Sequence, residues 1–155
     1  SHVAYDPKVN EEGLKHRSLK LSAFQKTLMP SKIFGDEEGE MLVVGWGSTK
    51  GAIEEAVQRL RDQGKKVSST HLTFLQPMAS GLKEMMQKFD KIMTVEISWC
   101  DSFEDEIIDD NNRRFSNLAW LLRGRYLRDV DGWCEVQGQP IKPRTIEKAI
   151  RARLS

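Results

Sequence analysis

The stretch with the clearest chemical potential is a run of glycines between an apolar segment and a helical pattern. Gly45, Gly47 and Gly51 follow the apolar residues 41–44. Glycines at such a turn let an anion approach the backbone N–H groups at the start of the next helix. The weak candidates for an anion site are therefore Gly47, Ser48 and Thr49.

Two interpretations of this turn remain open. The spacing of Gly45, Gly47 and Gly51 departs by one residue from the GxGxxG dinucleotide pattern. The next predicted strand ends at Leu72 without an acidic residue to bind a ribose. The turn can serve tight packing of a strand on a helix, or it can bind a phosphate group.

Four further residues are candidates for an interface rather than for catalysis. His71 stands at the carboxyl end of a predicted strand, where open parallel sheets often bind ligands. A general base needs a partner carboxylate or nucleophile, and none is evident, so we predict no catalytic residue. Trp46 is expected to fill an interdomain contact. Arg113 and Arg114 begin a late arginine cluster, expected to be solvated or to meet an acidic partner.

The acidic segment 102–112 is the remaining candidate for ion chemistry. Its five carboxylates do not follow EF-hand spacing, and Ile107 and Ile108 interrupt them. We predict no metal site. Cys100 and Cys134 form neither a CxxC pair nor a zinc pattern, and we expect them to be reduced thiols in a cytoplasmic protein.

The elements that must position these residues are strand and helix patterns that alternate along the chain. This alternation predicts an α/β fold with a largely parallel sheet of about four or five strands. Ser48 or Thr49 is a suitable N-cap for a helix that closes at Gly64, and Ser116 is expected to cap a later helix. The predicted strands are residues 41–44, 66–72, 91–97 and 126–130, with a turn at Gly132 and Trp133. The predicted helices are 11–28, 80–89, one after Ser116, and one opened by Pro143.

Size and charge limit the function classes. A chain of 155 residues favours one domain, and a net charge of +1 argues against a general attraction to nucleic acid or membranes. No apolar run approaches the roughly 18 residues of a membrane span, and no signal-peptide pattern opens the chain. The chain does not begin with Met, so we expect a piece of a longer parent.

Several motifs together resemble the C-terminal domain of the alpha subunit of 2-oxoacid:ferredoxin oxidoreductases, with the 2-oxoglutarate type as the best fit. The longest motif is residues 42–56, from Leu-Val-Val-Gly-Trp-Gly through Glu-Glu-Ala. The match continues at residues 2–7, 71–77, 94–96, 112–119, 130–133 and 138–140.

The resemblance implies a fold like the transketolase C-terminal domain, with three layers, α/β/α, and a mixed, mainly parallel five-stranded sheet. It implies a parent enzyme that converts a 2-oxoacid and coenzyme A to acyl-CoA and CO2 while reducing ferredoxin. Thiamine diphosphate, Mg and iron–sulfur clusters would act in that parent, and none of them is expected in this fragment.

The resemblance also implies the domain's place in the enzyme. Residues 1–34 would be a linker and leading helix from a preceding domain, and 35–155 the transketolase C-terminal-like domain. Its partners would be the beta subunit and the rest of the alpha subunit, in a dimer of heterodimers that meets ferredoxin. The fragment alone would be inactive. The alternative function is a regulatory module that binds a nucleotide or anion at the Gly45 to Gly51 turn.

Overall fold

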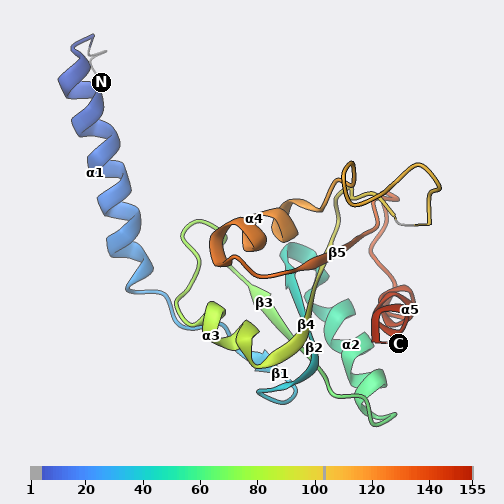
Figure 1. Cartoon of the computed structure of the whole chain (residues 1–155). Helices are drawn as coiled ribbons and strands as arrows, with labels where there is room; N and C mark the ends of the chain where they lie inside the picture. The colour runs from blue at the N-terminus through green and yellow to red at the C-terminus, as the bar shows by residue number, and fades with distance from the viewer. Residues whose placement is uncertain (1–4, 103, 155) are drawn as a thin grey trace.

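The computed structural model describes residues 5–102 and 104–154, which form a five-stranded sheet with the strand order β1-β3-β2-β4-β5 (Figure 1). The strands are β1 (Ile33–Phe34), β2 (Gly39–Trp46), β3 (Val67–Leu72), β4 (Phe89–Glu96) and β5 (Asp131–Cys134). The strands β2, β3, β4 and β5 are parallel to one another. Only the edge strand β1 among the described strands runs antiparallel, to its neighbour β3. The predicted α/β class and mainly parallel five-stranded sheet are confirmed.

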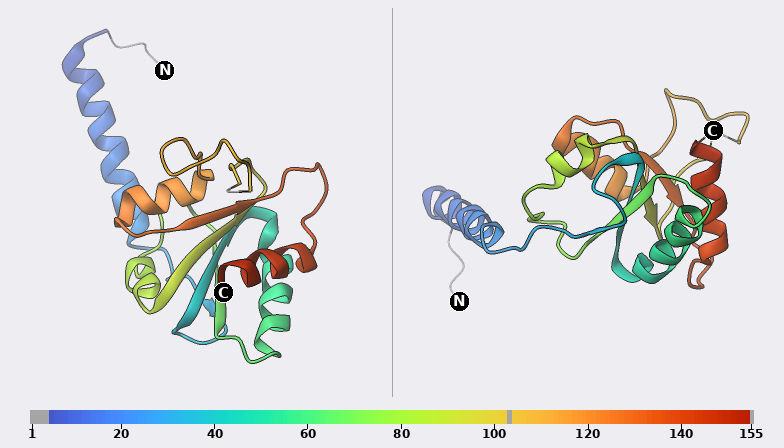
Figure 2. Two further views of the ribbon diagram at one scale, coloured as in Figure 1. Left: turned by 45° about the vertical axis from the view of Figure 1, so that its right-hand side comes forward. Right: turned by 90° about the horizontal axis from the view of Figure 1, so that it is seen from below.

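Helices cover both faces of the sheet, because the central strand β2 is apolar on both sides. Met41 and Val43 pack with α2 (Lys50–Arg61) and α5 (Pro143–Leu154). Leu42 and Val44 pack on the other face with α3 (Leu82–Gln87) and α4 (Asn117–Tyr126). The views in Figure 2 show these helices on opposite sides of the sheet. The predicted three layers are therefore present.

The first helix, α1 (Pro7–Gln25), projects away from the rest of the molecule and buries none of its side chains (Figure 1). It begins earlier than the predicted residues 11–28, because Asp6 caps it by accepting from the backbone N–H of Lys8 at 2.8 Å. Its last residue, Gln25, donates to the carbonyl of Met78 at 2.8 Å. Residues 1–4, which include part of the 2–7 motif, lie outside the described residues.

Three element predictions were wrong around β4 and β5. Residues 126–130 were predicted as a strand, but α4 extends to Tyr126 and the strand β5 occupies Asp131–Cys134. Gly132, predicted in a turn, lies inside β5, where an added Cβ would meet Ser116 Oγ at 2.7 Å. Phe89, predicted at the end of a helix, begins β4 and is buried.

The sheet begins within the segment predicted to be a linker. Ile33 pairs with Thr70 and Phe34 with Ser69, and Thr70 donates its hydroxyl to the carbonyl of Lys32 at 2.9 Å. The proposed division between residues 34 and 35 stays a prediction. Within the described part of the chain, no helix has the length and apolar character needed to cross a membrane.

Candidate functional site at the carboxyl edge of the sheet

The carboxyl ends of three parallel strands bring together Trp46, His71 and Glu96. Trp46 ends β2, His71 is the penultimate residue of β3, and Glu96 ends β4. Gly45 lies beside His71 on one neighbouring strand and beside Val95 on the other. This edge is where open α/β sheets usually bind ligands, and it carries the predicted glycine turn.

Gly45 is required for close packing of β2 on α2. A Cβ at this position would overlap the Cδ1 atom of Ile53 and lie 2.9 Å from Thr49 Oγ1. Gly47 has a φ of 64°, in the left-handed region that glycine adopts without strain, and it opens a short 3₁₀ turn, Gly47–Thr49, before α2. The geometry of Gly45 fits the packing interpretation of the turn.

The three anion-site candidates differ in their exposure to solvent. Thr49 is buried, and its hydroxyl donates to the carbonyl of Trp46 at 2.9 Å, so it is engaged inside the turn. Thr49 takes the predicted N-cap position of α2 but makes no side-chain capping bond. Gly47 and Ser48 are exposed. Anion binding at this turn stays a prediction.

Glu96 is a buried carboxylate that joins three elements, and no role was predicted for it from the sequence. Its two oxygens accept from the backbone N–H of Leu118 at 3.0 and 3.2 Å, and one accepts from Trp46 Nε1 at 3.4 Å. The carboxylate therefore sits at the N-terminus of α4, where the helix dipole favours negative charge. Glu96 occurs in the Thr94-Val95-Glu96 motif, but only the fold shows which helix it reaches.

Ser116 was predicted to cap α4, and the structure confirms it as the N-cap residue. Ser116 occupies the N-cap position, but it makes no side-chain bond to the helix. Its hydroxyl is 3.0 Å from Thr94 Oγ1 instead. Because the Glu96 carboxylate already accepts from the helix N–H, the Ser116 hydroxyl is available to bind β4.

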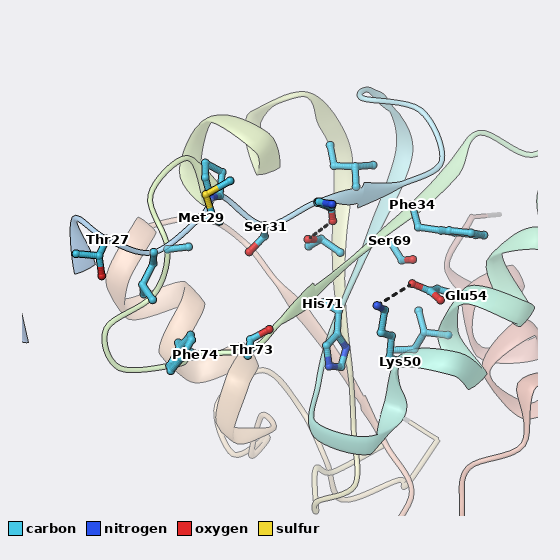
Figure 3. A pocket seen from close by; sticks show the side chains of 17 residues that line it. Thr27, Met29, Ser31, Phe34, Lys50, Glu54, Ser69, His71, Thr73 and Phe74 are labelled. Atoms are coloured by element: carbon cyan, nitrogen blue, oxygen red, sulfur yellow. Dashed lines mark hydrogen bonds and ion pairs between the residues drawn. The ribbon is translucent and has the colours of Figure 1, made fainter. Parts of the chain in front are cut away.

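His71 borders a cavity of about 590 Å³ between α2, β3 and residues 27–34 (Figure 3). Burial lowers the pKa of His71 below 6.5, and Lys50 adds to this effect, while Glu54 and the Gly47 backbone oppose it. The surroundings of the imidazole therefore favour its neutral form. Its Nδ1 is buried and has no hydrogen-bond partner among the described residues. Lys50 approaches Glu54 at 3.9 Å beside it (Figure 3).

The arginine candidates have different surroundings. The Arg113 side chain is 4% exposed and donates to Asp131 Oδ1 at 2.6 Å. Of the two expectations for the arginine cluster, solvation or contact with an acidic partner, solvation therefore does not hold for Arg113. The Arg114 side chain is 72% exposed and donates to both carboxylate oxygens of Asp101, at 2.9 and 3.0 Å. Interface roles for Trp46, His71 and both arginines stay predictions.

The acidic segment 102–112 gathers no candidate metal site. Across residues 5–102 and 104–154, no group of three or more His, Cys, Asp or Glu side chains could hold a metal ion. Asp109 instead orders the local turn, since its Oδ1 accepts from the backbone N–H of Asn111 at 2.7 Å. Residue 103 lies outside the described part.

Known proteins similar to this chain are subunits of larger oxidoreductases. The chain is 30% identical over 155 residues to the 2-oxoglutarate oxidoreductase subunit KorA of Mycobacterium tuberculosis, covering 99% of this chain and 21% of that protein. It is 30% identical over 138 residues to the alpha subunit of 2-oxoacid:ferredoxin oxidoreductase 1 of Aeropyrum pernix, covering 83% of this chain and 21% of that protein. The chain thus spans about a fifth of these curated relatives. No protein-family model matches the chain.

Solved structures show the same fold. The 2-oxoglutarate:ferredoxin oxidoreductase from Magnetococcus marinus superposes with a TM-score of 0.79 at 20% identity, over 98% of this chain and 24% of that one. A split-gene transketolase superposes with a TM-score of 0.55 at 18% identity, over 81% of this chain and 41% of that one. The fold is thus that of the transketolase C-terminal domain, as the resemblance implied.

Proposed function

We propose that this chain, which is homologous to the alpha subunits of 2-oxoacid:ferredoxin oxidoreductases, is the C-terminal domain of such a subunit. The observation that carries the proposal is the 30% identity to KorA, which runs through 99% of the chain. The transketolase C-terminal-like fold supports it independently. The parent enzyme would be a cytoplasmic oxidoreductase.

The proposed parent reaction converts 2-oxoglutarate and coenzyme A to succinyl-CoA and CO2 and reduces ferredoxin. The Magnetococcus marinus enzyme is described with 2-oxoglutarate, coenzyme A and succinyl-CoA bound, which supports this choice of 2-oxoacid. Thiamine diphosphate with Mg would supply the carbanion chemistry, and iron–sulfur clusters the electron transfer.

The residues of this chain do not fit an iron–sulfur cluster or a protein-held metal ion. A cluster is held by four ligands, mostly thiolates, and the chain has two cysteines. Among the described residues, no group of ionisable side chains could hold a metal. We therefore assign the cofactors to the rest of the alpha subunit and to the beta subunit.

We assign this domain a role in assembly and orientation. The helix α1 leaves Leu14, Leu19 and Phe24 at least 40% exposed, although apolar side chains of this size favour burial. Trp46 is 37% exposed and is oriented by its bond to Glu96. These surfaces would contact the remainder of the alpha subunit and the beta subunit in a dimer of heterodimers, which would then meet ferredoxin.

The test uses the full-length subunit, expressed with its partner, and the 155-residue chain side by side. The complex should reduce a viologen dye when given 2-oxoglutarate and coenzyme A, and the chain alone should not. Calorimetry should show no binding of thiamine diphosphate and Mg to the chain. Turnover by the isolated chain, or micromolar binding of thiamine diphosphate to it, would contradict the assigned role.

The alternative, a nucleotide- or anion-binding module, rests on the exposed Gly47 and Ser48 before α2. Internal use of the Thr49 hydroxyl argues against it. Titration with nucleotides, coenzyme A and inorganic phosphate can be followed by the fluorescence of Trp46, which adjoins the turn. We expect no change at millimolar ligand. A saturable change that Ser48→Ala abolishes would favour the alternative.

A further inference from the structure

Cys100 and Cys134 lie on neighbouring segments that leave the carboxyl edge of the sheet. Cys134 ends β5 and pairs in register with Glu96, the last residue of β4. Two contacts cross between the segments: Cys134 Sγ is 3.4 Å from Ser98 Oγ, and Cys100 Sγ is 3.7 Å from the carbonyl oxygen of Gly132. Each sulfur thus contacts the opposite segment, so both thiols lie in the contact between these two segments.

Both thiols are free and half-buried, so small reagents can reach them. They differ in acidity because the two side chains affect each other unequally. Cys100 lowers the pKa of Cys134, against the effect of burial, and Ser98 adds to the lowering. Cys134, together with burial, raises the pKa of Cys100. Cys134 therefore carries more thiolate, which is the form that reacts with oxidants.

We propose that Cys100 and Cys134 form an oxidation site, a dithiol that peroxides convert to an intrachain disulfide. This inference is independent of the proposed function. The Cys134 thiolate attacks one oxygen of hydrogen peroxide; an S–O bond forms, the O–O bond breaks, and the hydroxide that leaves takes a proton to become water. Sulfur is oxidised to the sulfenic acid, and peroxide is reduced.

Cys100 resolves this intermediate. Its sulfur attacks the Cys134 sulfur, the S–S bond forms and the S–O bond breaks. The leaving hydroxide takes the Cys100 proton, which gives a second water, so two thiols and one peroxide yield one disulfide and two waters. The new bond closes a loop that contains the acidic segment 102–112 and the helix α4, and it ties this loop to β5 beside Glu96.

The experiment treats the reduced chain with hydrogen peroxide, denatures it and alkylates the remaining thiols. We expect neither cysteine to be alkylated, and a proteolytic digest to contain one peptide pair joined through Cys100 and Cys134. Dithiothreitol should restore both thiols. Trp99 and Trp133 each adjoin one of the cysteines, so their fluorescence should fall on oxidation and recover on reduction.

Single serine variants separate the two roles, with circular dichroism as the check on folding. Cys100→Ser keeps a hydroxyl donor beside Cys134, and its Cys134 should form a sulfenic acid that dimedone traps. Cys134→Ser should react with peroxide at least about tenfold more slowly, since it lacks the more acidic thiol and burial still raises the pKa of Cys100. Thiols that stay alkylatable, disulfides formed between chains only, or equal rates in the two variants would overturn the proposal.

Discussion

Substituting Gly45 by alanine should destabilise the protein, because the glycine turn is packed against α2. The new Cβ would overlap Ile53 Cδ1 and approach Thr49 Oγ1 to 2.9 Å. Ile53 is 2% exposed, so its side chain has little room to move. Overpacking a core site costs about 1–3 kcal/mol. For a protein of this size, that corresponds to a fall in Tm of roughly 2 to 12 °C.

A double-mutant cycle tests whether the cost arises from the Ile53 methyl. Ile53→Val removes the overlapping Cδ1 atom and alone should cost about 0.5–1.5 kcal/mol. In that background, Gly45→Ala should cost at least about 0.5 kcal/mol less than in the native chain, as contacting residues couple. Free energies of unfolding come from urea titration followed by circular dichroism.

Gly51→Ala is the matched control in the same turn. No atom lies within 4 Å of a Cβ at Gly51, and the residue is in the first turn of α2. Alanine is the better helix former, so this variant should be unchanged or up to about 1 kcal/mol more stable. A Gly45→Ala variant as stable as the native chain, or strictly additive costs in the cycle, would refute the packing explanation.

Three further predictions concern the carboxyl edge, the buried ion pair and α1. Glu96→Ala should cost about 1–2 kcal/mol in urea titration, since it uncaps α4, and should shift the emission of Trp46; unchanged emission would contradict their contact. Burial raises the pKa of Asp131, but the lowering by Arg153 and Arg113 together outweighs this effect, so the net shift of the pKa is downward. The ion pairs therefore stabilise the fold above the unfolded pKa of about 4, and this stability is lost as pH falls through the lowered pKa. Asp131→Asn should cost about 3 kcal/mol at pH 7 and flatten the acid limb of the stability profile. Deleting residues 1–26 should change Tm by less than about 2 °C, since α1 buries no side chain, whereas deleting 1–34 removes β1 and should lower Tm clearly more.

The elements with strong local signals were predictable from the sequence. The apolar residues 41–44 predicted a strand, and in the structure Met41 and Val43 of β2 pack with Ile53 and Leu60 of α2. Pro143 marked the start of α5, within which Arg151 donates to Glu147 at 2.9 Å. In these elements local propensity and tertiary packing agree.

The errors arose where long-range contacts override local preference. Gly132 and Trp133 were predicted as a turn because glycine is common in turns. In the structure Gly132 lies inside β5, where Ser116 packs so closely that a side chain at this position would not fit. Residues 126–130 read as a strand because of their apolar content, yet Leu127 ends α4 in a left-handed conformation with φ of 52°. No pattern along the chain reveals the packing of Ser116 on Gly132 or the left-handed conformation of Leu127.

The carboxyl edge of the sheet is largely filled by the chain's own groups, which favours an interface over a ligand site. Glu96 binds Trp46 and the N-terminus of α4, so the helix dipole that could hold an anion is already neutralised. Thr49 bonds to the carbonyl of Trp46, and Gly45 is packed against Ile53. The indole of Trp46 remains accessible at this edge, beside the exposed Gly47 and Ser48, and its bond to Glu96 orients it. A rigid, partly exposed aromatic side chain is typical of an anchor for a protein partner.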